Sequence, residues 1–384
     1  PRLLRLVLDE IRQHRFMGIP GSLFYHPETK DPFRTERYNQ ILETPIGVAA
    51  GPHTQLSLNI IAAWLCGARY IELKTIQTLD ELDVTKPCID MQDEGYNCEW
   101  SQELKIHESF TEYLHAWIII HILRRKLGFQ GSCGTLFNMS VGYNLEGIMN
   151  TNVQWFFARM LDCTTDLTNA KNSIHDIYPE IDLINIPSRI SDHVTLSTMH
   201  GCPPEEIEKI GLYLIREKKL HTTIKLNPTL LGADELRNLL NTRLGFPTVV
   251  PDMAFEHDLK YPDALHILKS LMSASAEQGL QFGVKLTNTL ESVNNKGVFD
   301  VTESMMYLSG RALHPVSICL ARKLQNDMEG TLDISFSAGV DCFNVADVLA
   351  CGMKPVTVCS DLLKPGGYGR LSQYISNLRK EFAS

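Results

Sequence analysis

The sequence lacks the features that mark several large classes of protein. Its ten cysteines form no Cys-x-x-Cys pair and several lie in apolar runs, which argues against an iron–sulfur or tetracysteine zinc site and against a disulfide framework. The most apolar candidate span, 116–123, contains His121 and meets three basic residues, so no run approaches the length of a membrane span. The net charge of −9 argues against binding to a nucleic-acid backbone. We therefore expect a globular protein of a reducing, cytoplasmic compartment.

Several catalytic motifs are missing as well. The sequence has no HExxH or other metal-ligand spacing, no GxSxG, no P-loop and no GxGxxG fingerprint. It also has no linker rich in proline, glycine or serine that would divide its 384 residues into separate domains. We therefore interpret the chain as one large α/β domain with no resident metal.

The clearest local pattern lies between Val194 and Gly232. A short β-rich run at 194–198 precedes Pro203-Pro204-Glu205-Glu206, and proline and acidic residues of this kind favour a helix N-terminus. Isoleucine and leucine then recur with a helical period before a second strand at 222–226. The two strands of such a βαβ unit end at the same edge of a parallel sheet, so the residues that follow them are expected to meet there.

The same alternation continues through most of the chain. Candidate strands lie at 45–52, 69–74, 135–140, 194–198, 222–226, 249–255, 282–289, 333–337 and 355–360. A (β/α)8 barrel needs eight strands, and we assign 249–255 to an insertion because the helix at 264–277 leads directly into the next strand. The prediction is an α/β protein with a (β/α)8 TIM barrel over 44–384 and insertions near 76–103, 165–192 and 228–260. Residues 1–43 are expected to form an N-terminal helix and a wrapping extension.

Small, cationic and amide-bearing residues follow the predicted strands. They are Ala50, Gly51, Lys74, Thr75, Asn138, Cys202, Lys225, Thr287, Asn288, Thr289, Gly339 and Ser360. Small residues and backbone N–H groups after the last two strands are the usual phosphate grip of such a barrel. Two lysines facing its mouth suit an anionic or electron-accepting ring.

Seven segments occur in this order: PIGVAAGP, YIELKT, TIKLNPTL, VKLTNTL, YLSGRALHP, ISFSAGV and VTVCSDLL. Over most of 44–364 the sequence resembles the FMN-binding barrel of the dihydroorotate and dihydropyrimidine dehydrogenases. Two further segments, FNMSVGYNLEG and LSTMHGCPP, resemble the N-terminal barrel of a large flavoprotein named as a selenate reductase subunit, a dihydropyrimidine-dehydrogenase relative found with purine-catabolic enzymes. The resemblance implies an FMN-dependent oxidoreductase that acts on CH–CH or ring double bonds of a planar nitrogen heterocycle, of pyrimidine or purine type.

The resemblance also implies roles for single residues. Lys225 matches the family lysine that faces the N1/O2 edge of the flavin, where positive charge stabilises the reduced ring. Asn288, Thr289 and Thr198 match the substrate side. The positions expected to bind the cofactor are Ala50, Gly51, Lys74, Thr75, Asn138, Lys225 and Thr287, with Ser309, Gly310, Gly339 and Ser360 around its phosphate.

Cys202 matches the loop residue that serves as general acid or base in the related dehydrogenases. The loop departs from the family pattern, because HGCPP is shorter and lacks the asparagine expected before the cysteine. His200 is a rival proton donor, and a buried cysteine at a helix start is the structural alternative. The helix N-terminus is expected to lower the pKa of the Cys202 thiol.

The sequence leaves other functions open. The related enzymes move electrons from NAD(P)H through FAD and iron–sulfur clusters, for which this chain has no motif, so we expect those groups on other domains or on a partner subunit. A start at Pro1 also indicates that leading residues are missing. Two alternatives remain: an electron-relay FMN module of a selenate reductase complex, and a Schiff-base lyase on the same barrel that uses Lys225 or Lys285.

Overall fold

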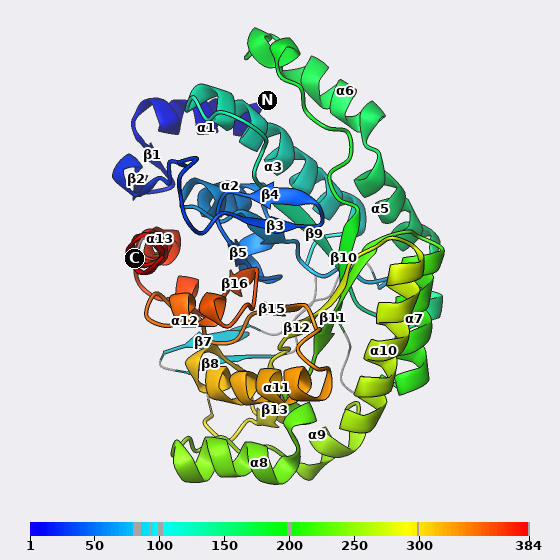
Figure 1. Cartoon of the computed structure of the whole chain (residues 1–384). Coiled ribbons are helices and arrows are strands. Elements are labelled where there is room, and N and C mark those ends of the chain that lie inside the picture. Colours follow the sequence, from blue (N-terminus) through cyan, green and yellow to red (C-terminus); the bar gives the residue numbers. More distant parts are fainter. Residues whose placement is uncertain (80–85, 93, 99–102, 198–201, 298, 383–384) are drawn as a thin grey trace.

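The chain is described by a computed structural model that covers residues 1–79, 86–92, 94–98, 103–197, 202–297 and 299–382. Eight parallel strands close into a barrel, which confirms the predicted fold class (Figure 1). In chain order they are β5 (Ile46–Val48), β6 (Tyr70–Glu72), β9 (Leu136–Val141), β10 (His193–Ser197), β11 (His221–Leu226), β12 (Phe282–Leu286), β15 (Ile334–Phe336) and β16 (Val356–Val358). The ring closes where β16 pairs with β5, with Val356 opposite Ile46.

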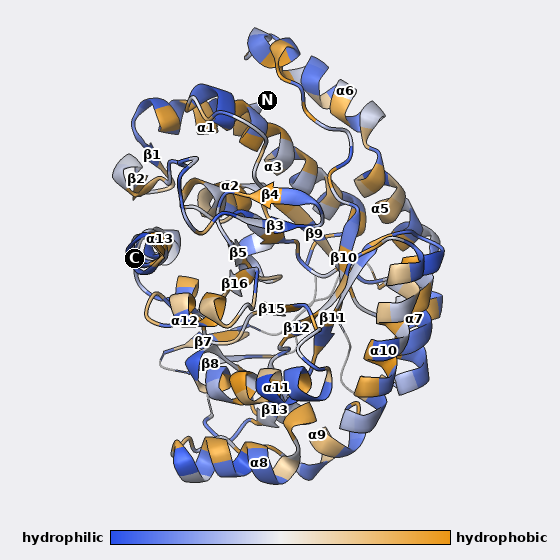
Figure 2. Cartoon of the chain, in the orientation of Figure 1, coloured by the Kyte–Doolittle hydropathy of each residue, from blue (hydrophilic) through white to orange (hydrophobic). Residues whose placement is uncertain are grey.

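Helices alternate with the strands and form the outer layer of the barrel (Figure 1). The main ones are α2 (Ser57–Leu65), α3 (Ile106–Lys126), α5 (Thr151–Leu161), α7 (Pro204–Arg216), α10 (Tyr261–Glu277), α11 (Leu313–Asp327), α12 (Val345–Ala350) and α13 (Leu371–Glu381). Figure 2 shows hydrophobic and hydrophilic residues mixed along these helices, as amphipathic packing requires. Among the described helices, none is long and apolar enough to cross a membrane.

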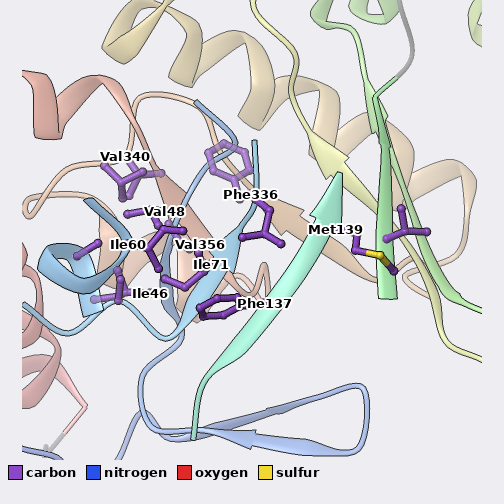
Figure 3. Packing of buried hydrophobic residues seen from close by; sticks show 14 of the residues in the cluster. Ile46, Val48, Ile60, Ile71, Phe137, Met139, Phe336, Val340 and Val356 are labelled. Carbon is purple, nitrogen blue, oxygen red and sulfur yellow. The ribbon is translucent and has the colours of Figure 1, made fainter. Parts of the chain in front are cut away.

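Much of the hydrophobic core lies between the barrel wall and its helices. Ile46, Val48, Ile71, Phe137 and Phe336 are fully buried and come from β5, β6, β9 and β15 (Figure 3). Strands of a parallel barrel are covered on both faces, so they read as continuous apolar runs rather than as alternating ones. This explains why the strand prediction succeeded.

The segments outside the barrel carry structure of their own. Residues 1–43 hold α1 (Arg2–Arg12) and the short pairs β1–β2 (Arg15–Phe16, Ile19–Pro20) and β3–β4 (Thr35–Arg37, Gln40–Leu42), and the 164–192 region holds α6 (Thr164–Ile174). Residues after β11 form α8 (Ala233–Arg237), a π-helix (Asn238–Arg243) and α9 (Asp252–His257). The run at 249–255 therefore enters α9 and is not a barrel strand, as predicted.

One sheet was not predicted. Strands β7 (Ile89–Met91), β8 (Gly95–Asn97), β13 (Leu290–Val293) and β14 (Met305–Ser309) form a four-stranded antiparallel sheet in the order β13-β14-β8-β7. The sequence analysis placed an insertion near 76–103 and assigned no strand between 290 and 309. The four strands join into one sheet where β14 pairs with β8, with Leu308 opposite Tyr96. This contact links two segments that lie far apart in the chain.

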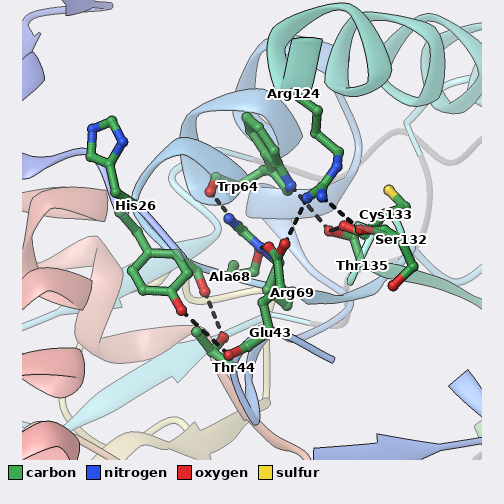
Figure 4. A network of polar contacts seen from close by, with 12 residues as sticks. His26, Glu43, Thr44, Trp64, Ala68, Arg69, Arg124, Ser132, Cys133 and Thr135 are labelled. Atoms are coloured by element: carbon green, nitrogen blue, oxygen red, sulfur yellow. Dashed lines mark hydrogen bonds and ion pairs between the residues drawn. The ribbon is translucent and has the colours of Figure 1, made fainter. Parts of the chain in front are cut away.

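A buried ionic network lies at the end of the barrel where the strands begin. Glu43 accepts from Arg69 Nε at 2.5 Å and from Arg124 Nη1 at 2.8 Å, and all three side chains are buried (Figure 4). Glu43 and Arg69 precede β5 and β6, so the network lies at the amino-terminal ends of the strands. Residues at that end of a TIM barrel serve stability, whereas ligands bind at the carboxyl ends.

Candidate functional site

A cavity of about 440 Å³ opens at the carboxyl ends of the barrel strands. This volume lies within the range typical of small-molecule and cofactor sites. Most of the residues that the sequence singled out line it: Ala50, Gly51, Lys74, Thr75, Lys225, Thr287, Asn288, Thr289, Ser309, Gly310, Gly339 and Ser360. The strand-end pattern thus brings together residues that are more than 300 positions apart.

Two lysines give the cavity its charge. Lys74 follows β6, Lys225 lies in β11, and both line the cavity. Burial lowers the pKa of Lys74 to about 8, with the Lys225 cation as a further cause. Burial also lowers the pKa of Lys225 to about 8. Cations that are costly to bury gain from an anionic ligand, so the cavity favours a negatively charged group.

Small residues build a tight cradle on one side of the cavity. The Ser309 and Ser360 hydroxyl oxygens lie 3.0 Å apart. A Cβ on Gly95 would come within 2.6 Å of Ser309 Oγ, and a Cβ on Gly339 would lie 2.4 Å from the Gly310 carbonyl oxygen. Backbone can approach this closely only at glycine. The cradle therefore presents backbone groups and hydroxyls, which are the donors that hold a phosphate.

The antiparallel sheet forms another wall of the cavity. Asp90, Tyr96 and Asn97 come from β7 and β8, and Tyr307 comes from β14. The Asn288 amide on the barrel side donates to Asn227 Oδ1 at 2.7 Å, which fixes the orientation of its side chain. Polar groups of both hydrogen-bonding types therefore line the cavity, from the antiparallel sheet and from the barrel strand ends.

Asn138 does not join the other predicted cofactor residues. It is fully buried in β9 and is absent from the residues that line the cavity. Its amide donates to Thr195 Oγ1 at 2.8 Å, and its carbonyl oxygen lies 3.0 Å from His193 Nδ1. Asn138 belongs to the polar packing of the barrel interior because it sits in the middle of β9 rather than at its carboxyl end.

The predicted proton donors are the least supported part of the site. Thr198 and His200 lie outside the described residues. Cys202 is partly buried against the hydrophobic core and does not line the cavity. Burial, and then the Glu206 carboxylate, raise the pKa of Cys202 to about 11, so the expected lowering by the helix N-terminus is wrong. Desolvation outweighs the helix terminus here.

Other site residues were missed. Gly95, Tyr307 and Cys359 line the cavity, and the first two depend on the sheet that the sequence did not reveal. Lys285 does not line the cavity but makes an ion pair with Glu72 inside the barrel, which argues against Lys285 as a Schiff-base nucleophile. A charged residue within each of two apolar strands was the signal that could have found this pair.

Comparisons with known proteins agree with the fold. Residues 17–384 match the family described as oxidoreductase YgfK, N-terminal TIM-barrel domain, and the chain belongs to this family. It is 43% identical to the oxidoreductase YgfK of Escherichia coli strain K12 and to that of strain O157:H7, over 98% of this chain. The chain spans only 38% of the length of these relatives.

Solved structures with a similar fold include DHODH from Eimeria tenella. The ligand-free form superposes with a TM-score of 0.56 at 13% identity, covering 93% of this chain and 88% of that one. The form in complex with ferulenol gives the same TM-score at 15% identity, covering 98% and 90%. At such low identity the likeness establishes the fold alone.

Proposed function

We propose that this member of the YgfK N-terminal barrel family binds FMN and oxidises or reduces a planar nitrogen heterocycle of pyrimidine or purine type. The observation that carries the proposal is the convergence of a buried lysine, Lys74, a half-buried lysine, Lys225, and a glycine–serine cradle on one cavity. A phosphate and an electron-accepting ring are the two parts of a ligand that such a pair of features would hold.

The residues present fit FMN. The cradle of Gly95, Ser309, Gly310, Gly339 and Ser360 would hold its phosphate, since a Cβ at Gly95 or Gly339 would collide with its neighbours and only glycine permits this close packing of the backbone. Lys225 and Lys74 would lie beside the ring and favour negative charge on it. When bound, FMN supplies hydride chemistry, and the protein supplies binding, orientation and electrostatics.

The protein's further contributions concern the substrate. Asn288, held by Asn227, would donate or accept hydrogen bonds at the edge of a heterocycle, as would Thr289 beside it. Cys202 remains our candidate for the proton donor, because a thiol with a pKa of about 11 keeps its proton at neutral pH. Electrons would enter from FAD and iron–sulfur domains elsewhere in a longer protein or on a partner, and the 38% coverage of the relatives supports this.

The direct test is to identify what the purified protein carries. We expect a yellow protein that releases FMN on heating, identified by its mass, and whose bleached spectrum is restored anaerobically by a pyrimidine or purine from a panel. Release of FAD, or of no flavin at all, would overturn the proposal. A lyase that uses Lys225 would instead be trapped as a covalent adduct by borohydride with a carbonyl substrate.

One observation favours a second candidate, an FMN module that relays electrons without substrate chemistry, of the kind expected in a selenate reductase complex. Cys202 is not among the cavity-lining residues, so the thiol expected to protonate the substrate does not line the cavity. A relay would bind FMN and exchange electrons with a partner, yet no heterocycle in the panel would restore the bleached spectrum.

A further inference from the structure

A charge pair spans the interior of the barrel. Lys285 Nζ on β12 bonds Glu72 Oε2 on β6, and both side chains are at least 98% buried. In the ring of strands β6 is four places from β12 in either direction, so the pair connects opposite walls. The second carboxylate oxygen, Glu72 Oε1, has no hydrogen-bond partner within the described part of the chain.

The pair lies directly beneath the cavity. Lys285 is the register partner of Lys225, which lines the cavity, and Glu72 precedes the lining residue Lys74 by two positions. Since β6 ends at Glu72 and the chain reaches the cavity two residues later at Lys74, Glu72 lies deeper in the barrel than Lys74. The Cys359 thiol is close enough to interact electrostatically with all three lysines.

A buried ion pair at this position needs an explanation beyond stability. Burying two charges costs several kcal/mol per ion, and well-packed apolar residues of similar size are often as stable or more so. The interior residues in register with the pair on the neighbouring strands, Asn138 beside Glu72 and Ser335 beside Lys285, are polar but uncharged. Glu72 and Lys285 are therefore expected to serve the ligand above them.

We propose that Glu72 and Lys285 are positioning residues that set the reduction potential of the flavin in the cavity, by fixing the net charge beneath it. This inference rests on the proposed FMN function. As a pair the two residues add no net charge to that of Lys74 and Lys225, whichever of them holds the proton. Loss of one partner leaves a single ionisable group of known sign, and positive charge near a flavin favours its reduced form while negative charge opposes it.

The test compares the FMN-loaded wild type with Glu72→Gln, Lys285→Met and the double variant, by anaerobic potential measurement at pH 6.0 and pH 8.5. Among the described residues, the Cys359 thiol interacts electrostatically with Lys285, and Lys225 is the register partner of Lys285 on β11; all variants retain both groups. Burial lowers the pKa of Lys285 to about 7, so Glu72→Gln should leave a cation at pH 6.0 and raise the potential there. Lys285→Met should leave the Glu72 carboxylate without its partner and lower the potential at pH 8.5.

Each single variant should change the ratio of the affinities for oxidised and reduced FMN by about tenfold. This is the effect of one unit charge roughly 10 Å away at an effective dielectric constant near 20. The double variant should follow the wild type at both pH values. A purely structural role would lower the unfolding temperature of the single variants without moving the potential in opposite directions, and that outcome would overturn the inference. If Lys285→Met does not fold, Glu72→Gln and the double variant decide the question.

Failure of the inference can be told from failure of the proposed function. Wild-type protein that binds FMN, with variants whose potentials match it, refutes the role of the pair alone. Wild-type protein that binds no FMN refutes the function itself before any variant is made.

Discussion

The hydroxyl oxygens of Ser309 and Ser360 lie 3.0 Å apart although 51 residues separate them in the chain. Ser309 ends β14 of the antiparallel sheet, and Ser360 follows β16 of the barrel. The cradle proposed for the phosphate is therefore built by two different sheets. Its shape depends on Gly95 and Gly339, where the backbone packs too closely against its neighbours to leave room for a side chain.

Gly339→Ala should weaken FMN binding strongly, by about tenfold or more. Gly339 has φ of +58° and its Cβ would lie 2.4 Å from the Gly310 carbonyl oxygen, so the cradle must open to accommodate it. Gly330→Ala is the matched control, because Gly330 has φ of +73° but open space around its Cβ position. Fluorescence titration measures the affinity of each variant for FMN. Equal loss in the two variants would mean that backbone strain alone, rather than crowding of the cradle, causes the effect.

Lys225→Ala should leave the fold intact, bind FMN more weakly and lower the flavin reduction potential. The cause is the loss of a positive charge beside the ring, which in a partly buried site is worth on the order of a few kcal/mol. Lys269→Ala on the outer surface of α10 is the control, since this lysine is exposed and far from the strand ends. A Lys225 variant with bound FMN and an unchanged potential would show that this lysine does not face the ring.

Cys202→Ala should leave FMN bound and reducible but slow substrate turnover by about a hundredfold, the usual loss for a missing general acid. Cys202→Ser should retain part of the activity, with a shifted pH optimum because a hydroxyl is a weaker acid than a thiol. Anaerobic restoration of the bleached spectrum by the best heterocycle reports the rate. His200→Ala is the companion variant: if it is inactive while Cys202→Ala is normal, the imidazole is the donor. Normal rates in both favour the relay.

Stability should fall in acid through His193. Burial lowers the pKa of His193 to about 3, whereas an unfolded histidine titrates near 6.5. The folded state therefore binds fewer protons, and the stability present above about pH 6.5 is lost as the pH falls toward 3, at about 1.4 kcal/mol per pH unit. His193→Gln should flatten this slope between pH 6.5 and 5 in urea unfolding, and His107→Gln on the surface should not. Parallel slopes for wild type and His193→Gln would contradict the assignment.

The sequence determined the fold class and part of the cavity lining. Apolar strands with small, cationic and amide residues after them recur at the spacing of βα units, and residues such as Lys74, Lys225 and Gly339 then had to meet because parallel strands end at one edge. These cavity-lining residues were predictable because the position of each depends only on where its own strand ends.

Only the tertiary structure decided the rest. The antiparallel sheet requires Tyr96 to pair with Leu308, a contact that leaves no trace in the local pattern. The sequence shows a charged residue in each of two apolar strands, but not that Lys285 reaches Glu72 on the opposite wall. Asn138 was assigned to the cofactor because the sequence does not show how far it lies from the end of β9. Cys202 was given a lowered pKa because burial, which here outweighs a helix terminus, is a property of packing and not of sequence.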